Sequence, residues 1–281
     1  MAPEAQNRIP TRPIPRSGEA IPELGMGTWK SFDVPRGPER ASLGGILRGF
    51  SAAGGALVDT SPMYGKAEAA LGELLPGMDQ GPKPFVATKV WTRGRAEGIR
   101  QMETSLALLG LEKLDLMQVH NLVDWETHVP VLREWKKEGR IRYWGLTHYL
   151  ESAFADLERV AASEKPDFLQ FNYSIGDTGA EERLLPFAAD NGIAVLINRP
   201  FGEGALFRRV AGKPLPAWAR EAGCRSWSGL FLKYILSHPA VTCAIPASGN
   251  PAHAAENLEY ALGGLPDTEQ RREWKRRIGQ I

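Results

Sequence analysis

The sequence contains little cysteine and no long hydrophobic run. It has two cysteines in 281 residues, and Cys243 lies in an apolar stretch, where a buried free thiol is favoured over a disulfide. No apolar segment approaches the roughly 18–20 residues that a membrane span requires. Residues 1–17 are polar and rich in proline, and they lack the apolar core of a secretory signal. We therefore expect a cytoplasmic protein that does not interact with membranes.

Neither sign of charge is in excess. The chain has 34 Lys and Arg against 33 Asp and Glu, a formal net charge of +1, and neither a basic arm nor an acidic tail. This balance argues against nucleic acid or a membrane surface as the main partner. Hydrophobic residues (43%) and charged residues (24%) occur in the proportions of a globular protein with an ample core. No linker, repeat or low-complexity segment divides the sequence, so we expect a single domain over residues 1–281, with residues 1–10 as a candidate flexible tail.

The sequence does contain a regular alternation of two kinds of segment. Eight apolar strand-like segments are each followed by a segment with apolar residues at helical spacing. Strands that are apolar throughout are typical of a parallel sheet covered on both faces. Eight such pairs in a chain not far above the typical 250 or so residues predict an α/β fold, a closed (β/α)8 or TIM barrel. The predicted strands are residues 23–29, 56–58, 85–89, 114–120, 142–148, 167–172, 193–198 and 241–246.

Polar residues that can carry chemistry follow three successive strands. The second strand ends at Asp59 with Tyr64 on the loop beyond it, the third ends at Lys89, and the fourth ends at His120. Singly, Asp59 could be a turn former or helix cap, Lys89 a solvated strand end, and His120 a hydrogen-bonded structural residue. In a barrel, however, the carboxyl ends of the strands converge on the face that holds the active site. We therefore expect these four side chains to share one pocket.

The segments that contain these residues resemble a known family. DTSPMYGKAEAALGELL, VATKVW and LDLMQVHN resemble the aldo-keto reductases, and the resemblance extends over about residues 9–265. It implies an N-terminal β-hairpin that caps the bottom of the barrel and a catalytic tetrad of Asp59, Tyr64, Lys89 and His120. It also implies reduction of an aldehyde or ketone to an alcohol. The sequence ends soon after its last predicted helix, as in bacterial members with a short C-terminal loop, so we expect an open substrate pocket.

The chemistry of the four residues agrees with this implication. Tyr64 would donate a proton to the carbonyl oxygen, although an unperturbed tyrosine has a pKa of about 10. A lysine cation nearby lowers that pKa, so Lys89 would make Tyr64 a better acid, and Asp59 would keep Lys89 charged and oriented. His120 would supply a second donor to the carbonyl oxygen. None of these groups can carry a hydride, so the reaction requires a redox cofactor.

The resemblance implies a nicotinamide cofactor and the residues that bind it. Thr147 and His148 stand where the family usually has Ser-Asn, Gln170 matches the glutamine that binds the carboxamide, and Asn198 replaces an aromatic residue that stacks on the nicotinamide ring. Stacking is therefore an open question. Gly27 and Thr28, at the end of the first predicted strand, are also expected to bind the cofactor, because a glycine there lets a ligand approach the backbone closely. The other implied cofactor-binding residues are Asp59, Arg199, Pro200, Phe201, Gly202, Gly204, Ile245, Ser248, Asn250, His253, Glu256 and Asn257.

The part of the sequence that resembles the family's adenosine-phosphate clamp lacks its cations. Ala247 stands where a lysine is common, and His253 stands where an arginine is common. Arginine can bind a 2′-phosphate with two hydrogen bonds, and histidine cannot. NADPH (NADP) is the first choice because it is the family's usual cofactor, and NADH (NAD) stays an alternative. We expect no metal site.

The predicted substrate opening is aromatic and mostly apolar. Its residues are Trp29, Tyr64, Trp91, His120 and Asn121, which suits a small hydrophobic carbonyl compound. Trp144 is expected in the core, and the protein is expected to be a monomer or weak oligomer. Two other functions stay open, namely a regulatory subunit that binds the cofactor with little turnover, and a lyase that uses Lys89 as a Schiff base. The second requires a neutral lysine, which the neighbouring Asp59 disfavours.

Overall fold

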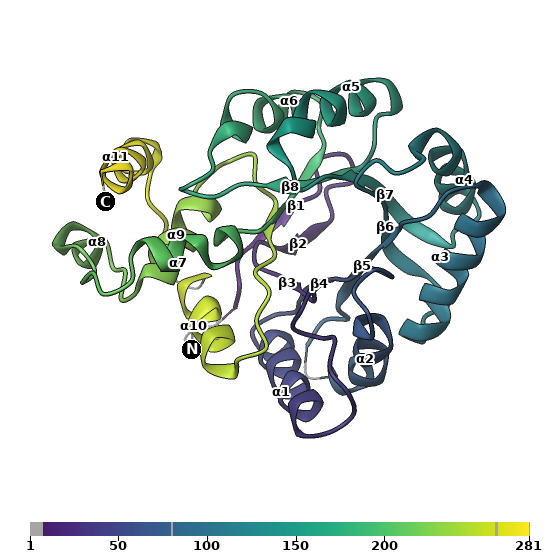
Figure 1. Ribbon diagram of the computed structural model, residues 1–281, viewed down its shortest axis with the longest axis horizontal. Coiled ribbons are helices and arrows are strands. Elements are labelled where there is room, and N and C mark those ends of the chain that lie inside the picture. Colours follow the sequence, from purple (N-terminus) through teal and green to yellow (C-terminus); the bar gives the residue numbers. More distant parts are fainter. Residues whose placement is uncertain (1–7, 80, 262–263, 281) are drawn as a thin grey trace, which may run out of the picture.

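A closed barrel of eight parallel strands forms the centre of the computed structural model, which describes residues 8–79, 81–261 and 264–280 (Figure 1). The strands follow one another around the barrel in chain order. Parallel bridges from Leu24 to Ala244 and from Gly27 to Ala247 close it between the last strand and the first. The strands are β3 (Met26–Gly27), β4 (Leu57–Asp59), β5 (Phe85–Val90), β6 (Leu114–His120), β7 (Ile141–Thr147), β8 (Phe168–Asn172), β9 (Ala194–Asn198) and β10 (Cys243–Ala244).

Helices surround the barrel and confirm the predicted strand–helix alternation (Figure 1). One α-helix follows each strand from β3 to β8, three follow β9, and two follow β10. They are α1 (Pro38–Ala52), α2 (Ala67–Leu74), α3 (Arg95–Leu109), α4 (Trp125–Lys137), α5 (Phe154–Glu164), α6 (Leu184–Asp190), α7 (Ala205–Arg209), α8 (Ala217–Glu221), α9 (Trp227–Leu236), α10 (Pro251–Ala261) and α11 (Thr268–Gly279), with 3-10 turns η2 (Leu75–Gly77), η3 (Glu151–Ala153), η4 (Gly179–Glu181) and η5 (Gly202–Gly204). No helix within the described residues is long and apolar enough to cross a membrane.

An antiparallel hairpin precedes the barrel, as predicted. Its strands β1 (Thr11–Pro13) and β2 (Ala20–Pro22) pair with Arg12 opposite Ile21. Ile21 and the neighbouring Ile14 pack against apolar residues inside the barrel, such as Leu57, so the hairpin covers one end of it. Residues 1–7 of the predicted flexible tail lie outside the described residues. Ile9 is buried, and its N–H donates to the carbonyl oxygen of Ala53 at 2.7 Å.

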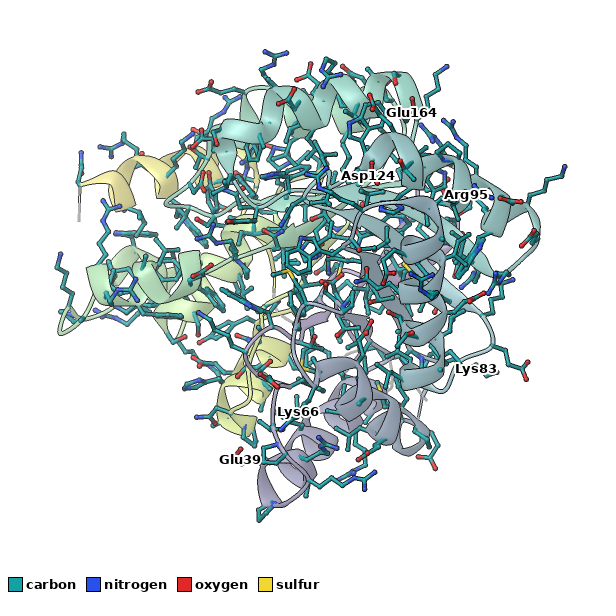
Figure 2. All side chains as sticks on the ribbon, turned by 45° about the vertical axis from the view of Figure 1, so that its right-hand side comes forward. Glu39, Lys66, Lys83, Arg95, Asp124 and Glu164 are labelled. Atoms are coloured by element: carbon teal, nitrogen blue, oxygen red, sulfur yellow. The ribbon has the colours of Figure 1, made fainter. Side chains whose placement is uncertain are left out.

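Charged side chains lie mainly on the outer surface of the helices and loops. Glu39, Lys83 and Arg95, for example, are exposed and project away from the barrel (Figure 2). The apolar faces of the helices pack on the outer face of the sheet in one large core, which includes Trp144 as expected. Cys243 is a buried free thiol, which confirms that prediction.

The inner face of the barrel changes from apolar to polar along each strand. Side chains two positions apart on a strand point to the same face. A second, smaller apolar cluster lies inside the barrel and includes Leu57, Ala87 and Leu116. The inward-facing positions that follow these on their strands are polar, including Asp59 and Lys89. Pairing in register therefore gathers the polar residues at the carboxyl end of the barrel, opposite the hairpin.

One carboxylate joins the C-terminal helix α11 to the barrel through several contacts. Glu181 accepts hydrogen bonds from the hydroxyl groups of Tyr173 (2.6 Å) and Tyr234 (2.7 Å) and forms ion pairs with Arg271 (2.5 Å) and Lys275 (2.9 Å) of α11. Burial raises the pKa of Glu181, but these hydrogen bonds and the charge of Arg271 lower it to about 2. The carboxylate thus links residues about 90 positions apart in the sequence.

We expect Glu181→Gln to lower the free energy of unfolding by about 1.5–3 kcal/mol at neutral pH, since a glutamine keeps the shape and loses the charge that four donors share. The depressed pKa gives the effect a pH dependence. The charge stabilises the fold above the unfolded pKa of 4.5, and this contribution is lost as pH falls from about 4.5 to about 2. Urea unfolding of both proteins at neutral pH and near pH 3 measures it. A difference that did not shrink at low pH would contradict this role of the charge.

Candidate active site

The three predicted strand-end residues and the loop tyrosine lie together at the carboxyl end of the barrel. Gly27 on β3 pairs with Asp59, and His120 on β6 pairs with Thr147 on β7. Lys89 on β5 pairs with Gln118, two residues before His120. Of these residues, Gly27, Asp59, His120 and Thr147 line one cavity with a volume of about 840 Å³, whereas Lys89 and Gln118 are buried and do not line it.

A buried ion pair lies at the base of this cavity. Lys89 Nζ is 2.6 Å from Asp59 Oδ2 and donates a second hydrogen bond to the carbonyl oxygen of Thr60 at 2.7 Å. Both side chains are at most 4% exposed. Burial lowers the pKa of Lys89, but the charge of Asp59 and the hydroxyl of Tyr64 raise it above its usual value. The amine is therefore a cation at neutral pH.

Asp59 is held by a residue that the sequence analysis did not single out. Gln118 is fully buried, and its Nε2 donates to Asp59 Oδ1 at 3.2 Å. Each carboxylate oxygen of Asp59 thus has its own donor, which fixes the orientation of the group toward Lys89. Gln118 and His120 are two residues apart on β6, so they share its inward face. This two-residue spacing in the sequence could have indicated that Gln118 belongs to the site.

Tyr64 lies beside the lysine on the loop after β4. The centre of its ring is 5.2 Å from Lys89 Nζ and 5.9 Å from the centre of the His120 ring, which meets it edge-on. Asp33 holds this loop in place, because its Oδ1 accepts a hydrogen bond from the N–H of Lys66 at 2.9 Å. Gly65 has a φ of 59°, and a Cβ there would lie 2.5 Å from Asp33, so this turn requires glycine.

The pKa of Tyr64 departs from the predicted direction. Burial raises it above the ordinary value of 10.0, and the charge and hydrogen bonding of Lys89 lower it only in part. The lysine acts in the expected sense, but a phenol in an apolar cavity loses the hydration that stabilises its anion. Tyr64 is therefore protonated at neutral pH, with the cation of Lys89 beside it.

His120 is an uncharged histidine on the wall of the cavity. Burial, together with the charges of Lys89 and His148, lowers its pKa to about 2. Its Nδ1 lies 3.0 Å from Ser61 Oγ. Trp91 lies next to it with ring centres 6.5 Å apart. A neutral imidazole beside Tyr64 can donate one hydrogen bond to a bound carbonyl oxygen.

Most of the predicted site residues line the cavity. Trp29 and Trp91 are 37% and 42% exposed and lie at its mouth, as expected of residues that contact substrate. Tyr64, His120 and Asn121 lie below them. The predicted cofactor-binding residues among the lining are Gly27, Thr28, Asp59, Thr147, Gln170, Asn198, Arg199, Pro200, Phe201, Gly204, Ile245 and Ser248.

Six predicted cofactor-binding residues lie outside this lining. The ring of His148 stacks on Tyr149, and its Nδ1 accepts from the N–H of Leu150 at 3.2 Å. Asn250 Oδ1 accepts from the N–H of Ala252 at 2.9 Å at the start of α10. The others are Gly202, beside the lining residues of its loop, and His253, Glu256 and Asn257 on α10. Their contact with a cofactor stays a prediction.

Several buried polar atoms in the cavity have no hydrogen-bond partner within the described residues. They are both amide atoms of Gln170, Oγ1 of Thr28, and Oδ1 of Asn121 and Asn198. Buried polar atoms are normally hydrogen-bonded, so unpaired ones in a cavity wall point to a ligand. A carboxamide, which both donates and accepts, matches the two free atoms of Gln170. The residues present therefore fit a nicotinamide.

Gly27 is required for a reason other than the predicted one. We expected a glycine here to let a ligand approach the backbone. A Cβ at Gly27 would instead lie 3.0 Å from the carbonyl oxygen of Ile245, where β3 meets the chain after β10. The residue lines the cavity, but the closure of the barrel explains the absence of a side chain.

The loops around the mouth contribute a lining residue, Lys30, and contacts of Arg199 that the sequence analysis did not identify. Lys30 lies over the ring of Trp29 at 4.1 Å and lines the cavity. Arg199 forms an ion pair with Glu203 (3.1 Å) and donates to the carbonyl oxygen of Tyr149 at 3.2 Å, which joins the loops after β7 and β9. The position of Lys30 next to Trp29 and the spacing of Arg199 and Glu203 could have indicated these contacts, whereas the hydrogen bond from Arg199 to Tyr149 joins separate loops.

At the carboxyl end of the closed parallel barrel, a tyrosine, a charged lysine and a neutral histidine lie close together. Such a group of side chains is typical of an enzyme site that transfers protons. The profile of the aldo/keto reductase family matches residues 23–275, so the chain belongs to this family of oxidoreductases. It is similar to the methylglyoxal reductase YeaE of Escherichia coli (strain K12), with 28% identity over 245 residues, 85% of this chain and 84% of that protein.

Two further relatives extend the comparison. The NADH-specific methylglyoxal reductase of the same organism is 27% identical over 247 residues, 74% of this chain and 72% of that protein. A crystal structure of an aldo/keto reductase from Klebsiella pneumoniae in complex with NADP and acetate superposes with a TM-score of 0.77 at 24% identity and covers 93% of each chain. At this identity the superposition supports the barrel fold.

Proposed function

We propose that the protein reduces an aldehyde or ketone to an alcohol with a nicotinamide cofactor, using Tyr64 as the proton donor. The observation that carries the proposal is the buried Lys89–Asp59 pair next to Tyr64. Asp59, Tyr64 and His120 line a cavity that is also lined by Gln170, whose buried amide has no hydrogen-bond partner within the described residues. Proton donors and a place for a carboxamide thus occur in one cavity.

Each group has a definite part in the reaction. Tyr64 gives its phenolic proton to the carbonyl oxygen, and the cation of Lys89 stabilises the phenolate that forms. His120 donates a hydrogen bond to the same oxygen and orients it. A reduced nicotinamide, when bound, would supply the hydride for the carbonyl carbon. Asp59 holds Lys89 in place, and Tyr64 recovers its proton from solvent.

The cofactor is NADPH in the first instance, with NADH as the alternative. The Klebsiella structure contains NADP, and one Escherichia coli relative is NADH-specific, so similar chains use both. Thr147, Gln170 and Asn198 would hold the nicotinamide end, and the loops around Pro200 and Ser248 would hold the phosphates.

Replacing His253 tests the adenosine end. His253 is exposed on the first turn of α10. We expect His253→Arg to tighten NADPH binding by about tenfold and to leave NADH binding unchanged, because only arginine makes a bidentate contact with the 2′-phosphate. Titration of tryptophan fluorescence with each nucleotide measures both Kd values, with His253→Gln as the neutral control. Equal tightening for both nucleotides would show that the added charge acts without recognising the 2′-phosphate.

The substrate is a small carbonyl compound with an apolar part. Trp29, Met63 and Trp91 surround the opening and are each more than a third exposed, so they offer apolar surface to a ligand. Two relatives carry the name methylglyoxal reductase, which makes methylglyoxal one member of the panel to be tested.

The test is oxidation of NADPH and NADH with a panel of aldehydes and ketones. Turnover of at least one carbonyl supports the proposal. Tight nucleotide binding without turnover of any would favour the regulatory-subunit alternative. The Schiff-base alternative needs a neutral amine at Lys89, whereas its ion pair with Asp59 holds it charged.

A further inference from the structure

The side of His120 that faces away from the cavity meets a buried hydroxyl. Ser61 is fully buried two residues beyond Asp59, and its Oγ lies 3.0 Å from His120 Nδ1. Ser61 does not line the cavity, whereas His120 does. The side chain of His120 therefore connects the hydroxyl of Ser61 to the cavity.

The direction of this hydrogen bond follows from the partners of the hydroxyl. Within the described residues Ser61 Oγ has two neighbours, His120 Nδ1 and the N–H of Met63 at 3.4 Å. The N–H of Met63 can only donate. The one acceptor for the hydroxyl proton is therefore Nδ1, and the opposite tautomer would leave that buried proton without an acceptor, which costs free energy.

We propose that Ser61 is a positioning residue that holds His120 in the tautomer with the proton on Nε2. The kinetic consequence of this inference rests on the proposed function, whereas the tautomer of His120 does not. A neutral imidazole has one N–H, and the hydrogen bond at one nitrogen decides where it lies. With Nδ1 accepting from Ser61, Nε2 presents a donor to the carbonyl oxygen. In the other tautomer Nε2 would present a lone pair to that oxygen and repel it.

The structural part of the proposal is tested by 15N NMR of histidine-labelled protein without substrate. Nitrogen chemical shifts distinguish a protonated from an unprotonated ring nitrogen, and His120→Ala assigns the signals among the five histidines. We expect Nε2 of His120 to be protonated in the wild type and the proton to be shared between both nitrogens in Ser61→Ala. A wild type with the proton on Nδ1 would overturn the proposal.

The kinetic part uses a double-mutant cycle. Ser61→Ala should lower kcat/KM by roughly 3- to 10-fold, as expected for the loss of one hydrogen bond, and should cause no further loss in the His120→Ala background. Ser51→Ala is the matched control, because Ser51 on α1 is as buried, its hydroxyl has no partner within the described residues, and it does not line the cavity. Equal losses in both backgrounds would overturn the proposal. If the wild type reduced no carbonyl, the proposed function would fail while the NMR result still decided the tautomer.

Discussion

Tyr64→Phe is expected to lower kcat/KM for carbonyl reduction by about 10²–10⁴-fold, the usual range for a positioned general acid. Phenylalanine keeps the ring that meets His120 edge-on and removes only the hydroxyl beside Lys89. Because burial already raises the pKa of this phenol, the wild-type group is protonated at neutral pH, and the loss reflects the absent proton rather than a changed charge. Steady-state kinetics with the best substrate of the panel measures the effect.

Two comparisons keep this result specific to proton donation. Nucleotide affinity, measured by fluorescence, should stay within a few-fold of the wild type, since the hydroxyl is not needed to hold the cofactor. Tyr143→Phe serves as the matched control, because Tyr143 belongs to the apolar cluster at the hairpin end, with its hydroxyl 2.6 Å from Glu19. Full activity in Tyr64→Phe would remove Tyr64 from its proposed role.

The fold could be predicted from the sequence because its signals are local. Eight apolar segments in alternation with helical ones define a barrel, and the end of each segment is visible in the sequence. Once the strands pair in order, Asp59, Lys89 and His120 must lie on neighbouring strand ends, which the pairing of β4, β5 and β6 bears out. Tyr64 could be placed on the loop after Asp59, but its part in the site came from the resemblance, because its position depends on a turn rather than on a strand.

What could not be predicted depends on contacts between distant segments. Glu181 joins α11 to the barrel through side chains about 90 residues away, and no local pattern marks such a partner. The direction of the Tyr64 pKa depends on the balance between burial and one nearby cation, which only coordinates provide. Ser61 could be seen in the sequence beside Asp59, but its partner His120 is 59 residues away.

Lys89→Met is expected to abolish most turnover and also to destabilise the fold, because it leaves the buried Asp59 without its cation. Breaking a buried ion pair on one side typically costs about 3–5 kcal/mol. Asp59 would keep one hydrogen bond, from Gln118, which does not offset the loss of a charge at 2.6 Å. Urea unfolding gives the stability change, and kcat/KM gives the catalytic one.

The double variant Lys89→Met/Asp59→Asn separates these two effects. Removing the unpaired charge of Asp59 should return most of the lost stability, because an asparagine can still accept a hydrogen bond from Gln118 and no ion is left in the cavity wall. Activity should stay as low as in Lys89→Met, since neither variant has a cation to stabilise the phenolate of Tyr64. Recovery of activity together with stability would mean that Lys89 serves the fold alone. Stability unchanged by Lys89→Met would mean that the pair carries no buried charge.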